Sequence, residues 1–273
     1  LTTKTPTAAY RGAGRPEGSF IIERMMDLAA AELGMDPVEI RKKNFIKPEE
    51  FPYKVPSGLT YDSGRYAVTL EKALEILDYK KFREEQARER KKGRYLGVGF
   101  STFVETASTG PSRMMAFSGH EYGAVRVEPT GRVTVLTGTS PHGQGGETTF
   151  AQIVADDLGV RPEDVTVLHG DTAVVPIGFG TGGSRGGTVG GTAVLLASQA
   201  VKEKARRIAA HLLEAAAEDI VLEDGKLHVK GLPDRAVTLK EVAQAAHRAA
   251  KLPPGMDPGL EASRVFDPPD FTV

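Results

Sequence analysis

Cysteine is absent from the 273-residue chain, and this absence excludes several kinds of site. Without a thiol the chain can form no disulfide, hold no iron–sulfur cluster through cysteine and offer no thiolate nucleophile. Such a composition fits a reducing, cytoplasmic location. Long apolar runs are also missing. None approaches the roughly 20 residues that a helix needs to cross a bilayer, and no signal peptide opens the chain, so we expect no membrane association.

A strong charge of either sign is lacking too. The formal net charge is −1, which gives no reason to expect a nucleic acid as partner. The six histidines show no H-E-x-x-H or comparable spacing, so we expect no metal ion held by protein ligands. His142 differs from the others because it lies in a glycine-rich loop. There it could hydrogen-bond an anion or make a purely structural bond to backbone.

Glycine, by contrast, is abundant and clustered. Of the 31 glycines, eight fall within the fourteen residues from 178 to 191. Such density packs a helix or strand poorly. It favours a backbone that lies close to a ligand or to another backbone.

A strand, a glycine-rich loop and a helix follow one another around residues 137–148, Thr-Gly-Thr-Ser-Pro-His-Gly-Gln-Gly-Gly-Glu-Thr. The preceding residues alternate as in a strand, and residues 150–158 show helical periodicity. Glycines allow close approach, and the free N–H groups of a helix start attract anions. We therefore predict an anion site, with phosphate as the ligand. The same order of strand, glycine-rich loop and helix occurs a second time. It consists of residues 165–168, a second glycine-rich loop and an alanine-rich helix over about 189–218.

The remaining pattern predicts an α+β fold of mixed sheets with helices packed on them. Period-two alternation marks strands, turn residues mark a hairpin, and a capping box marks the start of a last helix. No element is predicted in the Pro-rich segment from residue 252 onward. Because the chain also starts at Leu1, we expect a piece of a longer protein. The predicted elements are strands over 95–104, 120–128 and 133–137, a turn at 129–131, the hairpin turn Asp224-Gly225, and a helix capped by Thr238 and Glu241.

A domain boundary is predicted near residues 60–66. Residues 47–65 are rich in Pro, Gly and Ser, which is typical of a linker, and residues 68–90 then show helical periodicity with many charges. We therefore divide the chain into residues 1–60 and 66–273.

The first of these segments contains a helix over residues 20–33, preceded by the loop Tyr-Arg-Gly-Ala-Gly-Arg at residues 10–15. Apolar residues recur in it at helical spacing, and we expect them to pack in the core. A short helix follows, with Asp36 as N-cap and Pro37 in its first turn, and continues to Asn44. The apolar face expected of the longer helix comprises Ile22, Met25, Met26, Ala29 and Leu33, with Leu28 at its edge.

The second glycine-rich loop also matches two general motifs. Residues 178–183 fit G-x-G-x-x-G, but the dinucleotide fingerprint needs a strand ending in an acidic residue about 20 positions on, where this chain is helical. Residues 182–186 fit G-x-S-x-G, the nucleophile elbow of serine hydrolases, which makes Ser184 an alternative nucleophile, although no strand enters the first glycine directly. In a third interpretation both loops are tight turns without a ligand. The hydrolase partners, in the required order, would be Asp219 or Asp224 and His228 or His247.

Three segments carry a resemblance to one enzyme family. Residues 9–17 read Ala-Tyr-Arg-Gly-Ala-Gly-Arg-Pro-Glu, residues 140–149 read Ser-Pro-His-Gly-Gln-Gly-Gly-Glu-Thr-Thr, and residues 180–185 read Gly-Thr-Gly-Gly-Ser-Arg. They resemble motifs that occur in the same order in the molybdenum-binding large subunits of the xanthine dehydrogenase, aldehyde oxidase and carbon monoxide dehydrogenase family. Each motif is weak alone, but three in order with similar spacing are specific.

The resemblance implies a molybdopterin-binding domain and a pterin-bound molybdenum centre, in bacterial members often in the cytosine dinucleotide form. The pyrophosphate of that form would suit two anion-binding loops. Arg11, Gly12 and Ala13 match the loop beside the metal, where a backbone N–H can bond a molybdenum oxygen and an arginine can orient substrate. By the same resemblance, the cofactor is held by Thr139, Ser140, His142, Gly143, Gln144 and Gly145 and, further on, by Gly183, Ser184, Arg185 and Thr188.

The resemblance also implies an activity, the hydroxylation of an aldehyde or N-heterocycle with oxygen from water. Electrons would pass to an FAD-binding medium subunit and a [2Fe–2S] small subunit, and the large subunit would form a dimer. The glutamate that serves as base in the family belongs to a motif without a match after Phe266, so we expect the chain alone to be inactive. In copper-containing carbon monoxide dehydrogenases a cysteine follows the loop arginine. Gly12 stands there in this chain, so we expect the non-copper type.

Overall fold

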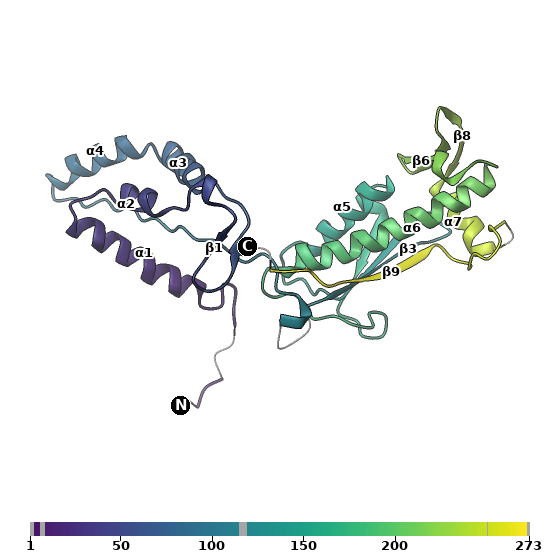
Figure 1. The fold of residues 1–273 in the computed structure, drawn as a ribbon, viewed down its shortest axis with the longest axis horizontal. Coiled ribbons are helices and arrows are strands. Elements are labelled where there is room, and N and C mark those ends of the chain that lie inside the picture. Colours follow the sequence, from purple (N-terminus) through teal and green to yellow (C-terminus); the bar gives the residue numbers. More distant parts are fainter. Residues whose placement is uncertain (1–2, 6–8, 115–118, 250, 272–273) are drawn as a thin grey trace. The chain divides into compact units, whose positions relative to one another are not determined.

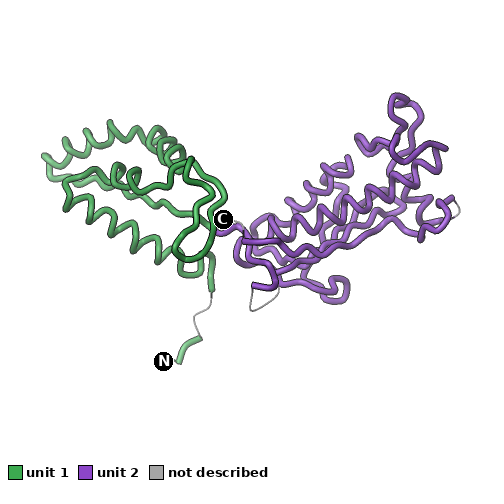
Figure 2. Tube along the Cα trace, in the orientation of Figure 1, with its two compact units in different colours: residues 1–105, 273 green, residues 106–272 purple. Residues whose placement is uncertain are grey.

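The protein forms two compact units, unit 1 up to Glu105 and unit 2 from Thr106 onward (Figure 2). Mixed sheets with helices packed on them confirm the predicted α+β class. Among the residues placed here, no helix combines the length and apolar character needed to cross a membrane. The structure is a computed structural model that describes residues 3–5, 9–114, 119–249 and 251–271.

The break between the units lies later in the chain than the predicted boundary near residues 60–66. Segments on either side of that region contact each other within unit 1. The Tyr79 hydroxyl donates to the Asp36 carboxylate at 3.0 Å, and the Lys42 ammonium lies 3.5 Å from the Glu71 carboxylate. The division into residues 1–60 and 66–273 as sequence domains stays a prediction.

Unit 1 consists of helices and one short hairpin. Asp36 caps the second helix as predicted, because its carboxylate accepts from the Val38 N–H at 2.8 Å. The helical stretch predicted over residues 68–90 is two helices, since Asp78 adopts a left-handed conformation with φ of 51° between them. The elements are α1 (Arg15–Glu32), α2 (Pro37–Asn44), a 3-10 turn (Pro48–Glu50), β1 (Tyr53–Lys54), β2 (Thr60–Tyr61), α3 (Tyr66–Leu77) and α4 (Tyr79–Arg90) (Figure 1).

The prediction of a strand over residues 95–104 is wrong. These residues belong to no strand, although their side chains alternate. Their backbone groups bond to side chains of helices instead of to a neighbouring strand. The Leu96 carbonyl accepts from the Gln86 amide at 2.7 Å, and the Thr102 N–H donates to the Glu23 carboxylate at 2.6 Å.

The predicted core face of α1 is also wrong, because the helix turns its polar side toward the unit. Most of its large apolar side chains are exposed, Ile22 to 65%. Glu23 and Arg41 are buried instead, with the Arg41 Nε donating to the Glu23 carboxylate at 2.7 Å. The guanidinium also bonds the Asp27 carboxylate at 2.9 Å and lies 5.3 Å above the Phe100 ring. A charged group of this kind can be buried only with such partners, which fixes the rotation of α1.

Unit 2 is built on a four-stranded sheet in the order β5-β4-β3-β9. The β4–β5 pairing is parallel, and the other pairings are antiparallel. Three strands confirm predictions. The last was missed, because its residues alternate weakly within a Pro-rich segment and are stabilised by pairing with β3. The strands are β3 (Glu121–Val127), β4 (Val133–Thr137), β5 (Val165–Leu168) and β9 (Glu261–Phe266).

Two helices, α5 (Gly146–Leu158) and α6 (Gly191–Leu212), cover one face of this sheet (Figure 1). Alternate residues of β3 and β4 are buried beneath them, as expected of a sheet with one covered face. A π-helical turn, Gly186–Gly190, leads into α6. The helix ends earlier than the predicted residue 218, because Glu214 adopts a left-handed conformation with φ of 49°.

A second sheet contacts α6 near its carboxyl end, where the Arg206 guanidinium donates to the Ile220 carbonyl at 3.1 Å. The hairpin at Asp224-Gly225 and the capping box of Thr238 and Glu241 are both confirmed. The remaining elements are β6 (Ile220–Glu223), β7 (Lys226–Val229), β8 (Leu232–Thr238), α7 (Leu239–Arg248) and 3-10 turns at Ser112–Met114, Pro162–Asp164 and Ala217–Asp219.

Candidate functional site

Two glycine-rich loops of unit 2 lie directly against each other. We call residues 138–146, which follow β4 and include the first residue of α5, the first glycine loop. Residues 178–186, which include the first residue of the π-helical turn, are the second glycine loop. The Gly180 N–H donates to the Gly138 carbonyl at 3.1 Å. A Cβ at Gly138 would lie 2.6 Å from the Gly178 Cα, so no side chain fits between the loops. The two loops are therefore adjacent in unit 2.

The first glycine loop presents hydrogen-bond donors to solvent. Helix α5 has Gly145 as its N-cap and no side-chain cap, so its first-turn N–H groups, apart from that of Glu147, lack acceptors within the helix. The exposed Gln144 side chain accepts from the His142 backbone N–H through Oε1, which leaves its NH₂ group pointing elsewhere. Space is open where a Cβ would stand at Gly143 and Gly145. The side chains of His142 and Gln144 are exposed and Ser140 is half-buried, at the rim of this loop.

A carboxylate and an imidazole beside this loop were missed by sequence reasoning. The His169 Nε2 lies 2.9 Å from the Glu147 carboxylate, and Gly170 lies next to the Ser140 hydroxyl. A bond from its own backbone N–H, followed by the His169 contact, lowers the pKa of Glu147. Glu147 thus competes with an external anion for the start of α5. An acid in a first helical turn is common, so the sequence contains no signal of this pairing.

The second glycine loop is exposed at Gly183 and Ser184, and Ser184 has a left-handed φ of 55°. Two other predicted residues turn their hydroxyls inward. The Thr188 hydroxyl donates to the Ala107 carbonyl at 2.7 Å, and the buried Thr139 hydroxyl lies 3.0 Å from that of Thr137. Both hydroxyls are therefore bonded to other groups of the protein.

Arg185, predicted to contact the cofactor, also faces inward. Its guanidinium is buried and forms an ion pair with the Glu121 carboxylate at 2.6 Å. Glu121 was not among the predicted site residues, because in the sequence it is only one position of an alternating strand.

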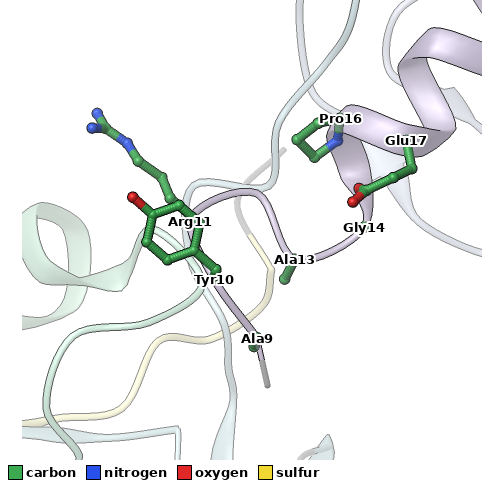
Figure 3. Close-up of a pocket in the computed structure, with 7 residues that line it drawn as sticks. All are labelled: Ala9, Tyr10, Arg11, Ala13, Gly14, Pro16 and Glu17. Atoms are coloured by element: carbon green, nitrogen blue, oxygen red, sulfur yellow. The ribbon is translucent and has the colours of Figure 1, made fainter. Parts of the chain in front are cut away.

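The predicted loop beside the metal belongs to unit 1 and precedes α1. Gly12, Ala13 and Gly14 all have positive φ, and the Ala13 N–H donates to the Tyr10 carbonyl at 2.6 Å. A non-glycine residue is uncommon in this region, so the surrounding loop holds Ala13 in this conformation. In Figure 3 the Arg11 side chain projects away from the Glu17 carboxylate. The loop lines a pocket of about 250 Å³ together with its neighbours, Ala9, Tyr10, Arg11, Ala13, Gly14, Pro16 and Glu17.

The serine hydrolase alternative is wrong. Ser184 precedes α6, whose 22 residues span about 33 Å. The sheet that contains His228 contacts the opposite end of this helix. His247 is elsewhere too, because α7 contacts the β3–β4 turn through the bond from Gln244 to the Pro129 carbonyl. No triad is assembled. Within the described part of the chain, no group of three or more His, Cys, Asp or Glu is arranged to hold a metal ion.

Comparison with known proteins finds matches to family models and to individual relatives. The family model for the molybdopterin cofactor-binding domain matches residues 72–272, and a second model of the same description matches residues 1–45. The carbon monoxide dehydrogenase large chain of Hydrogenophaga pseudoflava is 42% identical over 280 residues, 99% of this chain and 34% of the relative. The nicotine 6-hydroxylase large subunit of Paenarthrobacter nicotinovorans is 37% identical over 98% of this chain and 33% of the relative.

Solved structures agree with these relatives. Quinoline 2-oxidoreductase from Pseudomonas putida 86 superposes with a TM-score of 0.88 at 42% identity, over 98% of this chain and 35% of that one. Carbon monoxide dehydrogenase from Oligotropha carboxidovorans gives a TM-score of 0.88 at 39% identity, over 98% and 34% of the two chains. The chain thus spans about a third of the length of these four relatives. It belongs to the family of molybdopterin cofactor-binding domains and corresponds to this portion of a molybdenum hydroxylase large subunit.

Proposed function

We propose that the two glycine loops of unit 2 together hold the phosphate end of a molybdopterin cofactor. The observation that carries this proposal is the contact between the loops at Gly138 and Gly178. It brings the start of α5 and the approach to α6 to one place, so two sets of backbone donors can act on one ligand. Two sets of donors suit a pyrophosphate, which favours the cytosine dinucleotide form.

The residues at the exposed rim fit such a group. Backbone N–H groups of the first glycine loop and the Gln144 amide would donate to phosphate oxygens, with Ser140 and His142 beside them. From the second glycine loop, Gly183 and the Ser184 hydroxyl would contribute in the same way. Thr139, Arg185 and Thr188 would act by supporting the loops, since their side chains are engaged inside the protein. When bound, the cofactor would supply the molybdenum centre that accepts electrons from the substrate.

For the loop at Arg11, Gly12 and Ala13, which resembles the family's loop beside the metal, we propose a role at the active site of the complete large subunit. The Ala13 N–H is already donated to Tyr10. We propose that the Gly12 N–H and the Arg11 guanidinium act as donors here and that the guanidinium orients a substrate. The likeness to a nicotine hydroxylase and a quinoline oxidoreductase favours an N-heterocycle over an aldehyde as the substrate. Gly12 and the lack of cysteine favour a centre without copper.

The partners follow from the same likeness. We propose that the complete large subunit passes electrons to an FAD-binding medium subunit and a [2Fe–2S] small subunit, and that it dimerises. This chain spans about a third of its relatives. We therefore propose that it does not turn over an aldehyde or N-heterocycle by itself, and such turnover would contradict this part of the proposal.

The test uses the chain itself and cytidine 5′-diphosphate, which carries a pyrophosphate and the expected base. Isothermal titration should detect binding to the wild type. Gly138→Val should abolish it, because a side chain there collides with Gly178. Gly97→Ala in unit 1 is the matched control, since no atom lies within 4 Å of its added Cβ. Equal binding by both variants would overturn the proposal.

A further inference from the structure

A buried ion pair lies beneath both glycine loops. The Arg185 guanidinium and the Glu121 carboxylate are 2.6 Å apart, and their side chains are 4% and 0% exposed. Removing two charges from water is unfavourable unless every polar atom finds a partner. The contacts of this pair therefore indicate what it holds in place.

The guanidinium joins the second glycine loop to the start of β3. One terminal nitrogen donates to Glu121 and, at 3.3 Å, to the Gly180 carbonyl. The other donates to the Gly119 and His120 carbonyls at 3.0 and 2.6 Å. Arginine has five N–H donors, of which the four terminal ones are used here. The terminal nitrogens therefore keep no N–H for an external phosphate.

The Glu121 carboxylate contacts the first glycine loop. Glu121 accepts from the Tyr122 N–H at 3.0 Å through the oxygen that does not face Arg185. The same oxygen lies against Gly138, where an added Cβ would collide with it. One pair thus contacts both loops on their inner side, at the point where Gly180 bonds to Gly138.

We propose that Glu121 and Arg185 are positioning residues that set the spacing of the two glycine loops, and that Arg185 acts through the loops and not through phosphate. This inference rests on the proposed cofactor site. Glycine-rich backbone has many accessible conformations, so loops of this kind need an external constraint to present donors at a fixed separation. The ion pair supplies it, because the guanidinium bonds the second glycine loop to the start of β3 and the carboxylate packs directly against Gly138 of the first glycine loop.

Glu121→Gln separates the two possible roles of Arg185. If Arg185 bound phosphate directly, removing the carboxylate would free the guanidinium, and affinity for cytidine 5′-diphosphate would be unchanged or would rise. For a positioning role, affinity falls about tenfold or more, as is usual when orienting partners are removed. Titration calorimetry measures whether the affinity for cytidine 5′-diphosphate falls or rises. An unchanged or increased affinity would overturn the inference.

A neutral double variant guards against misfolding. Glu121→Gln with Arg185→Gln leaves no uncompensated buried charge, so the fold should persist in circular dichroism. Affinity should still fall. The matched control is Glu23→Gln with Arg41→Gln, which removes the buried pair of unit 1 and should leave binding unchanged. Arg185→Lys keeps the charge but not the planar set of donors, so its affinity for cytidine 5′-diphosphate should also lie below that of the wild type. Wild-type affinity in this variant would show that charge alone suffices and would contradict the positioning role.

Hydrogen exchange distinguishes failure of this inference from failure of the proposed function. If the wild type binds no cytidine 5′-diphosphate, the proposed cofactor site is in error. The positioning role is then judged from exchange in Glu121→Gln. Faster exchange in both 138–146 and 178–186 supports it, whereas a change confined to residues 119–122 contradicts it.

Discussion

Each unit of this protein buries an arginine–glutamate pair, but the two pairs have different surroundings. In unit 2 the Arg185–Glu121 pair lies at the end of a sheet whose covered face packs apolar side chains against α5 and α6. In unit 1 the Arg41–Glu23 pair itself occupies the interior, and the apolar side of α1 is turned outward. The comparison teaches that a buried ion pair can support a site in one unit and orient a helix in the other.

The largest expected effect concerns Arg41. Arg41→Ala leaves Glu23 buried without its cation and also removes the stacking on Phe100, which should cost about 3–5 kcal/mol. Hydrogen exchange measured at increasing denaturant should show that unit 1 opens at a lower concentration than in the wild type, while α6 keeps its protection. Equal loss of protection in both units would contradict their separate stabilities.

A matched pair of isoleucines tests the reversed orientation of α1. Ile208 on α6 is 0% exposed and Ile22 on α1 is 65% exposed. Ile208→Ala should cost about 2–5 kcal/mol, because it removes buried methyl groups and leaves a cavity. Ile22→Ala should change stability by about 0.5 kcal/mol or less. Similar costs in urea denaturation would mean that the exposed face of α1 is covered in solution.

The smallest expected effect is a pH dependence of unit 1. Burial raises the pKa of Glu23, but bonds from Thr102 and Arg41 outweigh it and hold the pKa below its usual 4.5. A lowered folded pKa means stabilisation that is complete above the unfolded value and is lost as pH falls through the folded value. Denaturation of unit 1 measured from pH 6 downward should therefore show a loss of stability below about pH 4.5. Glu23→Gln should remove that part of the pH dependence.

Local patterns predicted much of unit 2. Alternation identified β3, β4 and β5, and the capping box located the start of α7, because these signals depend on neighbouring residues only. β9 could not be predicted in the same way, since its strand conformation depends on pairing with β3, far away in the sequence. The exposure of the α1 face escaped prediction as well. Periodicity shows that a face is apolar but not which side of the helix a buried partner such as Arg41 will select.

For the candidate site, the sequence located both glycine loops but not their contact. Helix starts and glycines are local features, whereas the bond from Gly180 to Gly138 depends on the order of strands in the sheet. The inward turn of Arg185 was missed for a related reason. Its partner Glu121 begins another strand, and no spacing in the sequence connects the two.

The parallel pairing of β4 and β5 has a consequence for how this protein could change over time. Both strands run in the same direction, so the segments that leave them emerge at one edge of the sheet. The hairpin at Asp224-Gly225 and the turn at residues 129–131 lie at sites remote from that edge. Exposed residues of those two turns, such as Asp224 and Thr130, can be replaced without altering the glycine loops, whereas Gly138 and Gly178 leave no room for even one methyl group. Tolerance of substitution and strict constraint are thus located in different parts of unit 2.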